Sequence, residues 1–306
     1  MRIAIMGSGG VGGYIGGRLA AAGEDVTFIA RGAHLEAIRA HGLALESTLG
    51  DVTIAPAQAS DDPAAVGPVD LVIFTVKLYD TEAAAEATRP LLGPATGVVT
   101  FQNGVDSTEV LGGLLGIERV IGGVAQIGAV LARPGVVRHS SPFARFLFGE
   151  LDGTRSARVD ALAEACIAAG IDHEVSADIS LAIWRKMIFL APMSGMTALL
   201  RRPIGPIRAD PDTRAMLERA IDEAVQVALA AKVRVTDAAV EETMAWVDAL
   251  APGMRSSMLE DLEQGRRLEL PWLSGALVRL GRKLGVPTPT HAFIATALKL
   301  HAAGGA

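Results

Sequence analysis

The sequence predicts an α/β fold, in which a doubly wound sheet is followed by an all-helical C-terminal domain. Three observations support this prediction: apolar runs that alternate with helix-length segments up to about residue 150, a glycine-rich turn after the first run, and long helical periodicities in the second half. At 306 residues the chain exceeds what one hydrophobic core usually serves, so we expect two domains. We place them at residues 1–175 and 176–306.

The first half of the chain contains short runs that are typical of buried strands. They are RIAIMG, DVTFIA, LALES, DVTIAP, DLVIFTV, GVVTFQ, RVIGGVAQIG, GVVRHS and ARFLFG. Because runs that are apolar throughout are covered on both faces, we expect parallel strands with helices on either side of the sheet. A short IDHEV run near residue 173 is interpreted as a last edge strand.

The second half of the chain shows helical periodicity in place of strand signals. The segments that carry it include RVDALAEACIAAG, DTRAMLERAIDEAVQVALAAK, DAAVEETMAWVDAL and SGALVRLGRKLG. Apolar residues at this spacing form one face of a helix, so the second domain is predicted to be helical.

Composition excludes several classes of protein. With 50% hydrophobic and 20% charged residues, disorder is not expected, and a net charge of −6 without a basic run argues against a nucleic-acid partner. The one cysteine, Cys166, permits no intramolecular disulfide, and the six histidines show no metal-ligand spacing. We expect no metal, no signal peptide, no membrane segment, a cytoplasmic location and a small-molecule substrate. The apolar helices of the second domain are compatible with a homodimer.

A glycine-rich turn follows the first apolar run directly and opens a helix. It consists of Gly7, Ser8, Gly9, Gly10, Val11 and Gly12. Glycines at this spacing give a tight turn, close approach of the backbone to a pyrophosphate, and close packing of helix on strand. The phosphate would lie at the N-terminus of the helix, where free N–H groups favour negative charge. The order of strand, turn, helix and second strand therefore predicts a Rossmann-type dinucleotide-binding domain.

The residue after the second strand indicates which dinucleotide is bound. Enzymes that use NAD tend to have an acidic residue there, whereas arginine accommodates the 2′-phosphate of NADP. Here the strand ends in Arg31, while Glu24 and Asp25 precede it, so we predict NADP. The other interpretation is that Arg31 caps a solvated strand end.

Two polar residues follow further strands. Lys77 comes just after LVIFTV and Asn103 just after GVVTF. Ligands of open α/β sheets bind at the carboxyl ends of the strands, so these side chains are predicted to face the cofactor. On spacing alone, both segments could equally be ordinary polar loops.

Lys186 and Glu269 are the candidate catalytic residues. Lys186 shares a helical face with Ile183 and Leu190, and an ammonium in apolar surroundings has a lowered pKa unless a carboxylate offsets the loss of hydration. Glu269, flanked by apolar residues in RRLELPWLSG, is the expected partner. Periodicity alone also allows a lysine that extends to water or one that forms a structural ion pair.

Two serines precede this glutamate. Ser256 and Ser257, in MRSSMLEDLEQG, could offer a hydroxyl to a substrate carboxylate. Alternatively they cap the helix that follows, with Ser257 as the N-cap.

Taken in order, these motifs resemble the ketopantoate reductase family over essentially the whole chain. The matching motifs are GSGGVG, TVK with Lys77, QNG with Asn103, WRK with Lys186, and SSM with Ser257 followed twelve residues later by Glu269. The resemblance implies reduction of a 2-oxo acid by NADPH, in the family's case ketopantoate (2-dehydropantoate) to pantoate in pantothenate biosynthesis. It also implies a Rossmann domain followed by a helical domain.

The resemblance also implies roles for the matched residues. Lys186 matches the proton donor to the developing alkoxide, and Asn103 a residue that touches the nicotinamide ribose and the substrate. Ser257 matches a substrate-binding hydroxyl, and Glu269 a glutamate near cofactor and substrate. Catalysis is therefore expected to rest on Lys186 and Glu269.

Ala129, in QIGAV, matches a backbone contact to NADP, and Arg31 and Lys77 match positive groups around the adenosine phosphate and ribose.

One departure from the family pattern concerns the substrate. Members that reduce ketopantoate commonly have asparagines four and eight residues after the lysine, where this chain has Leu190 and Ser194. Replacing an amide by leucine makes the pocket more apolar. The alternatives are therefore a related reductase acting on a different 2-oxo acid or ketone, or a non-catalytic NADP-binding regulator.

Overall fold

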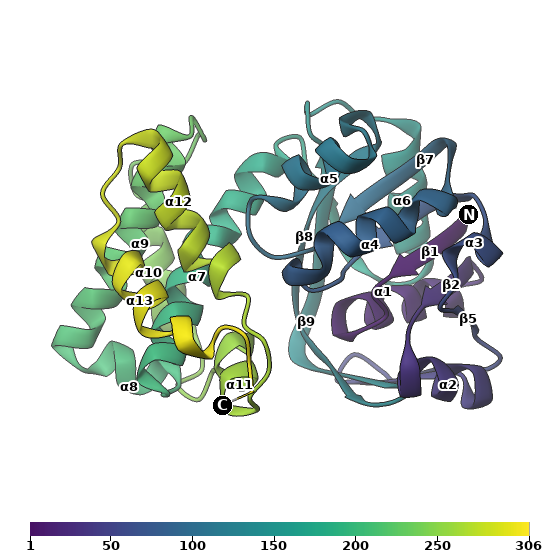
Figure 1. Cartoon of the computed structure of the whole chain (residues 1–306), viewed down its shortest axis with the longest axis horizontal. Coiled ribbons are helices and arrows are strands. Elements are labelled where there is room, and N and C mark those ends of the chain that lie inside the picture. The colour runs from purple at the N-terminus through teal and green to yellow at the C-terminus, as the bar shows by residue number, and fades with distance from the viewer. Residues whose placement is uncertain (306) are drawn as a thin grey trace. The chain divides into compact units, whose positions relative to one another are not determined.

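The computed structural model describes residues 1–305 of the chain, which divides into two compact units. The sheet unit comprises residues 1–102 and 107–182, and the helical unit comprises residues 103–106 and 183–306. The predicted fold class is confirmed, because a sheet with flanking helices comes first and residues 183–305 form helices joined by loops, with no strand among them. Figure 1 shows the strands in purple to teal and the helices of the second half in green to yellow.

The sheet described within residues 1–305 has ten strands, in the order β4-β3-β9-β8-β7-β6-β1-β2-β5, with β10 paired to β9. The central strand β1 is parallel to β2 and β6, and β7 and β8 continue the parallel arrangement. The strands are β1 (Arg2–Met6), β2 (Asp25–Ile29), β3 (Leu43–Ser47), β4 (Val52–Ile54), β5 (Gln58–Ser60), β6 (Val69–Phe74), β7 (Leu92–Thr100), β8 (Val120–Arg133), β9 (Val136–Glu150) and β10 (Asp172–Val175).

Helices cover both faces of this sheet, as the apolar strands predict. Successive side chains of β1 alternate between the faces, so Ile3 and Ile5 join a core cluster with α1, α2 and α6. Ala4 and Met6 join a second cluster with α4 and α5. Burying an isoleucine side chain stabilises the fold by about 1.5–3 kcal/mol. The helices are α1 (Gly10–Ala21), α2 (Gly32–His41), α3 (Pro63–Val66), α4 (Thr81–Thr88), α5 (Ser107–Leu115) and α6 (Ala157–Ala168).

The prediction that the strands are parallel is wrong for β8 and β9, which form an antiparallel pair. Two residues, Pro134 and Gly135, join these strands, and so short a connection can only reverse the chain. The GVVRHS and ARFLFG runs, expected as separate strands, are both parts of β9. The short strands β3 and β4 also pair antiparallel.

The end of the sheet unit agrees with the edge strand expected at IDHEV. This segment forms β10, which is parallel to β9. The helical periodicity that begins near residue 155 is α6 of the sheet unit, where Leu162 and Cys166 are fully buried. Burial raises the pKa of the Cys166 thiol to about 12, so this cysteine is a protonated core residue.

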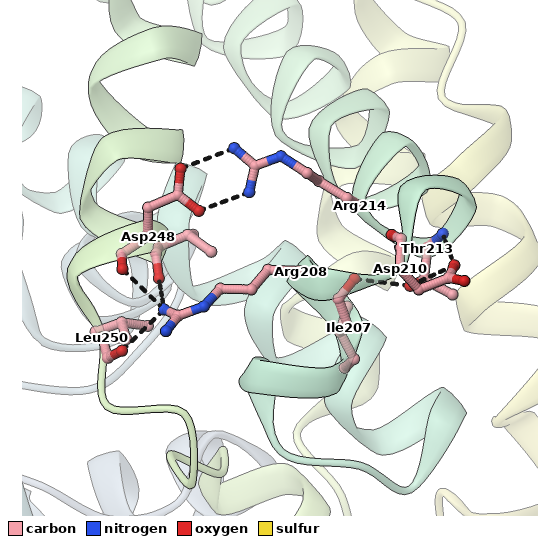
Figure 2. Close-up of polar contacts among 8 residues, drawn as sticks. Ile207, Arg208, Asp210, Thr213, Arg214, Asp248 and Leu250 are labelled. Carbon is pink, nitrogen blue, oxygen red and sulfur yellow. Dashed lines mark hydrogen bonds and ion pairs between the residues drawn. The ribbon is translucent and has the colours of Figure 1, made fainter.

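The helical unit is built from α7 to α13. Within it, Figure 2 shows how a guanidinium joins α8 and α10: Arg208 Nη1 donates to the carbonyl oxygens of Asp248 at 3.0 Å and of Leu250 at 2.8 Å. Arg214 of α9 pairs with both carboxylate oxygens of Asp248 at 2.6 and 2.7 Å. The last carbonyls of a helix lack partners within the helix, so these cations satisfy the end of α10 and join three helices. The helices are α7 (Ile179–Leu200), α8 (Ile204–Ala209), α9 (Pro211–Ala230), α10 (Ala239–Ala249), α11 (Ser257–Glu263), α12 (Ser274–Leu284) and α13 (Pro289–Ala297).

Candidate active site

The glycine turn, residues 7–12, connects β1 to α1. A Cβ atom on Gly7 would lie 2.7 Å from a backbone nitrogen of the segment after β6, and one on Gly12 would lie 2.3 Å from the Gly7 carbonyl oxygen. A Cβ atom on Gly10 would lie 2.2 Å from the carbonyl oxygen of Ala129, because β8 passes against the turn. On Gly9 it would meet nothing within 4 Å. The turn is therefore closed by the protein at three glycines and open at Gly9.

The N-terminus of α1 lies at this open position. Gly9 is the N-cap, no side chain of residues 1–305 caps the helix, and its first turn holds no acidic residue. Backbone N–H groups without a partner at a helix N-terminus favour an anion such as phosphate. Ser8 is buried and its hydroxyl donates to the Ile29 carbonyl oxygen at 3.0 Å, so the Ser8 side chain holds the turn. Val11 packs against the core.

Two cationic residues follow strands that end next to the glycine turn. Arg31 is exposed at the N-cap of α2, two residues past β2, and its side chain forms no hydrogen bond or ion pair within residues 1–305. Lys77 is exposed three residues past β6. Because β1, β2 and β6 are parallel neighbours, both residues follow strands that end at the edge of the glycine turn. Glu24 and Asp25 lie at the amino end of β2, away from that edge.

Asn103 and Glu269 are brought together in the helical unit. Asn103 lies three residues past β7, and its Nδ2 donates to Glu269 Oε2 at 3.2 Å. The Glu269 residue is 6% exposed, between Leu268 and Leu270, which are also buried. Because burying a carboxylate is costly without polar partners, the Asn103 amide helps to hold the charge of Glu269.

Lys186 lies on α7, in electrostatic contact with this glutamate. Burial lowers the pKa of the Lys186 ammonium from 10.5 to about 8, and the nearby charge of Glu269 opposes that decrease. At neutral pH the ammonium therefore predominates, but it releases its proton far more readily than an exposed lysine. A lysine in electrostatic contact with a buried glutamate can serve either as a proton donor or as part of a structural ion pair.

Two further residues follow Lys186 along α7 at intervals of four. Leu190 is partly buried one turn on, and Ser194 is 1% exposed. The Ser194 hydroxyl has no hydrogen-bond partner among residues 1–305. A buried hydroxyl without a partner costs about 1–3 kcal/mol, so Ser194 Oγ is a polar group able to accept or donate one further hydrogen bond.

The serine pair differs from one prediction. The N-cap of α11 is Ser256, whose hydroxyl accepts from Leu259 N at 3.1 Å and bonds Thr197 Oγ1 at 2.7 Å. Ser257, expected as a possible N-cap, is the first residue of the helix and is exposed. The helix starts one residue earlier because Ser256 has the extended backbone of a cap. The Ser257 hydroxyl is thus not used for capping.

Three histidines, which the sequence analysis considered only as metal ligands, have structural contacts. His139 and His291 are 2% and 0% exposed, and His291 Nε2 lies 2.9 Å from the Ala220 carbonyl oxygen. Burial lowers the pKa of His291, which keeps it neutral. His34 is bonded to Ser8 of the glycine turn.

Within residues 1–305, no group of three or more histidine, cysteine, aspartate or glutamate residues is arranged to hold a metal ion. No helix in that range is long and apolar enough to cross a membrane.

Comparisons with known proteins agree over nearly the whole chain. The family model described as ketopantoate reductase PanE/ApbA matches residues 3–153, and the model of the C-terminal domain of the same family matches residues 178–302. A 2-dehydropantoate 2-reductase of Mesorhizobium japonicum is 35% identical over 317 residues, covering 95% of this chain and 94% of that protein.

Solved structures show the same fold. The crystal structure of 2-dehydropantoate 2-reductase from Geobacter metallireducens GS-15 is 33% identical, with a TM-score of 0.92 over 98% of this chain and 99% of that one. A ternary structure of D-mandelate dehydrogenase with NADH and anilino(oxo)acetate has a TM-score of 0.89 at 24% identity, covering 99% of this chain and 98% of that one. At that identity the likeness concerns the fold alone.

Proposed function

Because the chain belongs to the ketopantoate reductase family of oxidoreductases, we propose that it uses NADPH to reduce a 2-oxo acid to a 2-hydroxy acid. The first substrate to test is 2-dehydropantoate, whose reduction gives pantoate. The observation that carries the proposal is Lys186, an ammonium with a pKa of about 8 in the electrostatic field of a buried glutamate. A group that is protonated at neutral pH yet gives up its proton readily is suited to general-acid catalysis.

The glycine turn fits the pyrophosphate of a dinucleotide. The free space at Gly9, next to an uncapped helix N-terminus, allows close approach of phosphate to the backbone. Arg31 and Lys77 would hold the 2′-phosphate and the adenosine ribose, and the unpaired guanidinium of Arg31 supports NADP over NAD. Ala129, whose carbonyl lies against Gly10, would offer a backbone contact. When bound, NADPH supplies the hydride.

Lys186 would deliver the proton that completes the reaction. As the C2 carbonyl carbon accepts a hydride, charge develops on its oxygen, and Lys186 Nζ donates a proton to that oxygen. The products are a 2-hydroxy acid and a neutral amine, which recovers its proton from water. Glu269 is assigned a supporting role, because its negative charge favours the ammonium before the transfer. Asn103 would keep Glu269 in place and contact the substrate, and Ser257 would bind the substrate carboxylate.

A second candidate function is reduction of a 2-oxo acid other than ketopantoate. Leu190, one turn after Lys186, offers an apolar contact and no hydrogen bond, which favours substrates with apolar side chains. The free hydroxyl of Ser194 offers one polar contact. A non-catalytic regulator is not favoured, since the chain belongs to a family of oxidoreductases and a sensor needs no proton donor. A cytoplasmic location and a homodimer stay predictions.

The test combines a substrate panel with a matched pair of variants. NADPH consumption is measured with 2-dehydropantoate and with 2-oxo acids bearing aliphatic or aromatic side chains, and NADH is run in parallel. Turnover of 2-dehydropantoate supports the first proposal, and turnover of the apolar acids alone supports the second.

We expect Lys186→Met to lower kcat by at least a hundredfold while NADPH still binds. The variant Arg185→Met, at the exposed neighbouring residue, should remain near wild type. Normal turnover in Lys186→Met would refute the assignment.

A further inference from the structure

His34 lies in the first turn of α2, where its ring joins two backbone groups. His34 Nε2 lies 2.7 Å from the Ser8 carbonyl oxygen, and the Gly135 N–H donates to His34 Nδ1 at 3.0 Å. A carbonyl oxygen only accepts and a backbone N–H only donates, so Nε2 carries the proton and Nδ1 keeps its lone pair. The ring is therefore a neutral imidazole in one tautomer, fixed by its two partners.

These partners belong to two different turns of the sheet unit. Ser8 is part of the glycine turn, where its N–H and its hydroxyl both donate to the Ile29 carbonyl oxygen at the end of β2. Gly135 is part of the turn between β8 and β9, and its carbonyl oxygen accepts from Ala44 N at 2.9 Å. His34 is thus the link between the glycine turn and the turn that carries β8 into β9.

The bond to Ser8 determines how the next peptide group is oriented. The Ser8–Gly9 peptide bond is trans, so the Gly9 N–H points in the direction opposite to the Ser8 carbonyl. The carbonyl points to His34, and Gly9 is the position of the turn that the protein leaves open. Glycine restricts its own backbone less than any other residue, so without His34 this peptide group could rotate.

We propose that His34 is a positioning residue for the cofactor: by holding the Ser8 carbonyl, it keeps the Gly9 N–H aimed at the site of the pyrophosphate. This inference rests on the proposed binding of NADPH at the glycine turn. Loss of the histidine lets the Ser8–Gly9 peptide adopt several orientations, and NADPH must then select one of them on binding. The cost appears in affinity for NADPH, and the chemical step is unchanged.

Three variants test the proposal, and NADPH affinity is measured by fluorescence titration of the purified protein. His34→Leu removes both hydrogen bonds at similar volume. His34→Gln restores a donor and an acceptor on one planar group, which can serve Ser8 and Gly135 together. His41→Gln, at the exposed end of the same helix, is the matched control. The melting temperature of each variant without cofactor, and kcat and KM for NADPH, are recorded alongside.

We expect His34→Leu to raise the Kd and KM for NADPH at least tenfold while kcat at saturating NADPH stays within about twofold. His34→Gln should recover most of the affinity, and His41→Gln should match wild type. An unchanged Kd in His34→Leu would overturn the proposal, even if its melting temperature fell, because the histidine would then serve folding only. If His34→Leu does not fold, His34→Gln and His34→Asn decide: equal affinities contradict the proposal, since asparagine is too short to reach both turns. Failure of the wild-type protein to bind NADPH would instead refute the proposed function, and this inference with it.

Discussion

Replacing Glu269 by glutamine should move the pH dependence of catalysis by an amount that the structure allows us to work out. The charge of Glu269 raises the pKa of Lys186 against the effect of burial, and the wild-type balance lies at about 8. A neighbouring opposite charge commonly shifts a pKa by about 1–3 units. Removing that charge therefore lowers the pKa of Lys186 further, and the low end of this range corresponds to a roughly tenfold weaker hold on the proton. The amide is nearly isosteric and can still contact Asn103, so the change is mainly one of charge.

The consequence for the rate follows from the fraction of ammonium. With the wild-type pKa of about 8, that fraction is about 0.76 at pH 7.5 and about 0.24 at pH 8.5, whereas a roughly tenfold weaker hold on the proton leaves about 0.24 and about 0.03. Since reduction requires the protonated form, kcat/KM declines as pH rises through the pKa. The variant should therefore lose about threefold at pH 7.5 and about eightfold at pH 8.5 from this cause alone. Oxidation of the alcohol needs the neutral amine and should show the opposite dependence.

The assay is kcat/KM for NADPH oxidation between pH 5.5 and 10, with the best substrate of the panel. Glu263→Gln is the control, because this glutamate on α11 pairs with Arg255 at the surface. We expect the downward bend to move to lower pH in Glu269→Gln and to stay in place in Glu263→Gln. A bend that does not move, or one that moves to higher pH, would show that Glu269 does not set the charge state of the proton donor.

Two further predictions concern the cofactor. Gly9→Ala should keep the melting temperature of the wild type but bind NADPH more weakly, because its new Cβ enters the open space of the turn. Gly10→Ala should melt at a lower temperature, because its Cβ collides with the β8 backbone. Calorimetry and titration separate these outcomes, and equal melting temperatures for the two variants would contradict the packing described for the turn. Arg31→Ala should raise the Kd for NADPH at least tenfold and leave that for NADH nearly unchanged. Parallel loss of both affinities would argue against a 2′-phosphate contact.

Local patterns were sufficient to predict much of the fold. Residues 2–21 form a strand, a glycine turn and a helix, as predicted. These elements follow from the spacing of apolar residues and of glycines, which are properties of neighbouring positions in the sequence. The antiparallel pairing of β8 and β9 depends on the two-residue turn at Pro134 and Gly135, a local feature that departs from the parallel pattern of the earlier strands. The start of α11 was misplaced by one residue because two adjacent serines have equal intrinsic tendency to cap a helix.

The candidate site, like the fold, could be predicted from the sequence only in part. Lys186 and Glu269 could be proposed from an apolar context, but the pKa of the lysine depends on its burial in the folded unit and on Glu269, which is distant in sequence. The bond between Asn103 and Glu269 spans 166 residues, which no local pattern specifies. His34 was missed because its two partners are backbone groups, which carry no sequence signature.

The segment at residues 103–106 has a consequence for how the chain can be divided. After β7 the chain leaves the sheet unit, contributes these four residues to the helical unit, and returns to the sheet unit at α5. They supply the amide of Asn103 to Glu269 and the carboxylate of Asp106 to Arg279, at 2.8 Å. A fragment that begins at α7 would therefore contain Lys186, the proposed proton donor, but lack Asn103, whose amide donates to Glu269. A cut between β10 and α7 therefore separates the Asn103 amide from Glu269 and the Asp106 carboxylate from Arg279, although all four residues belong to one compact unit.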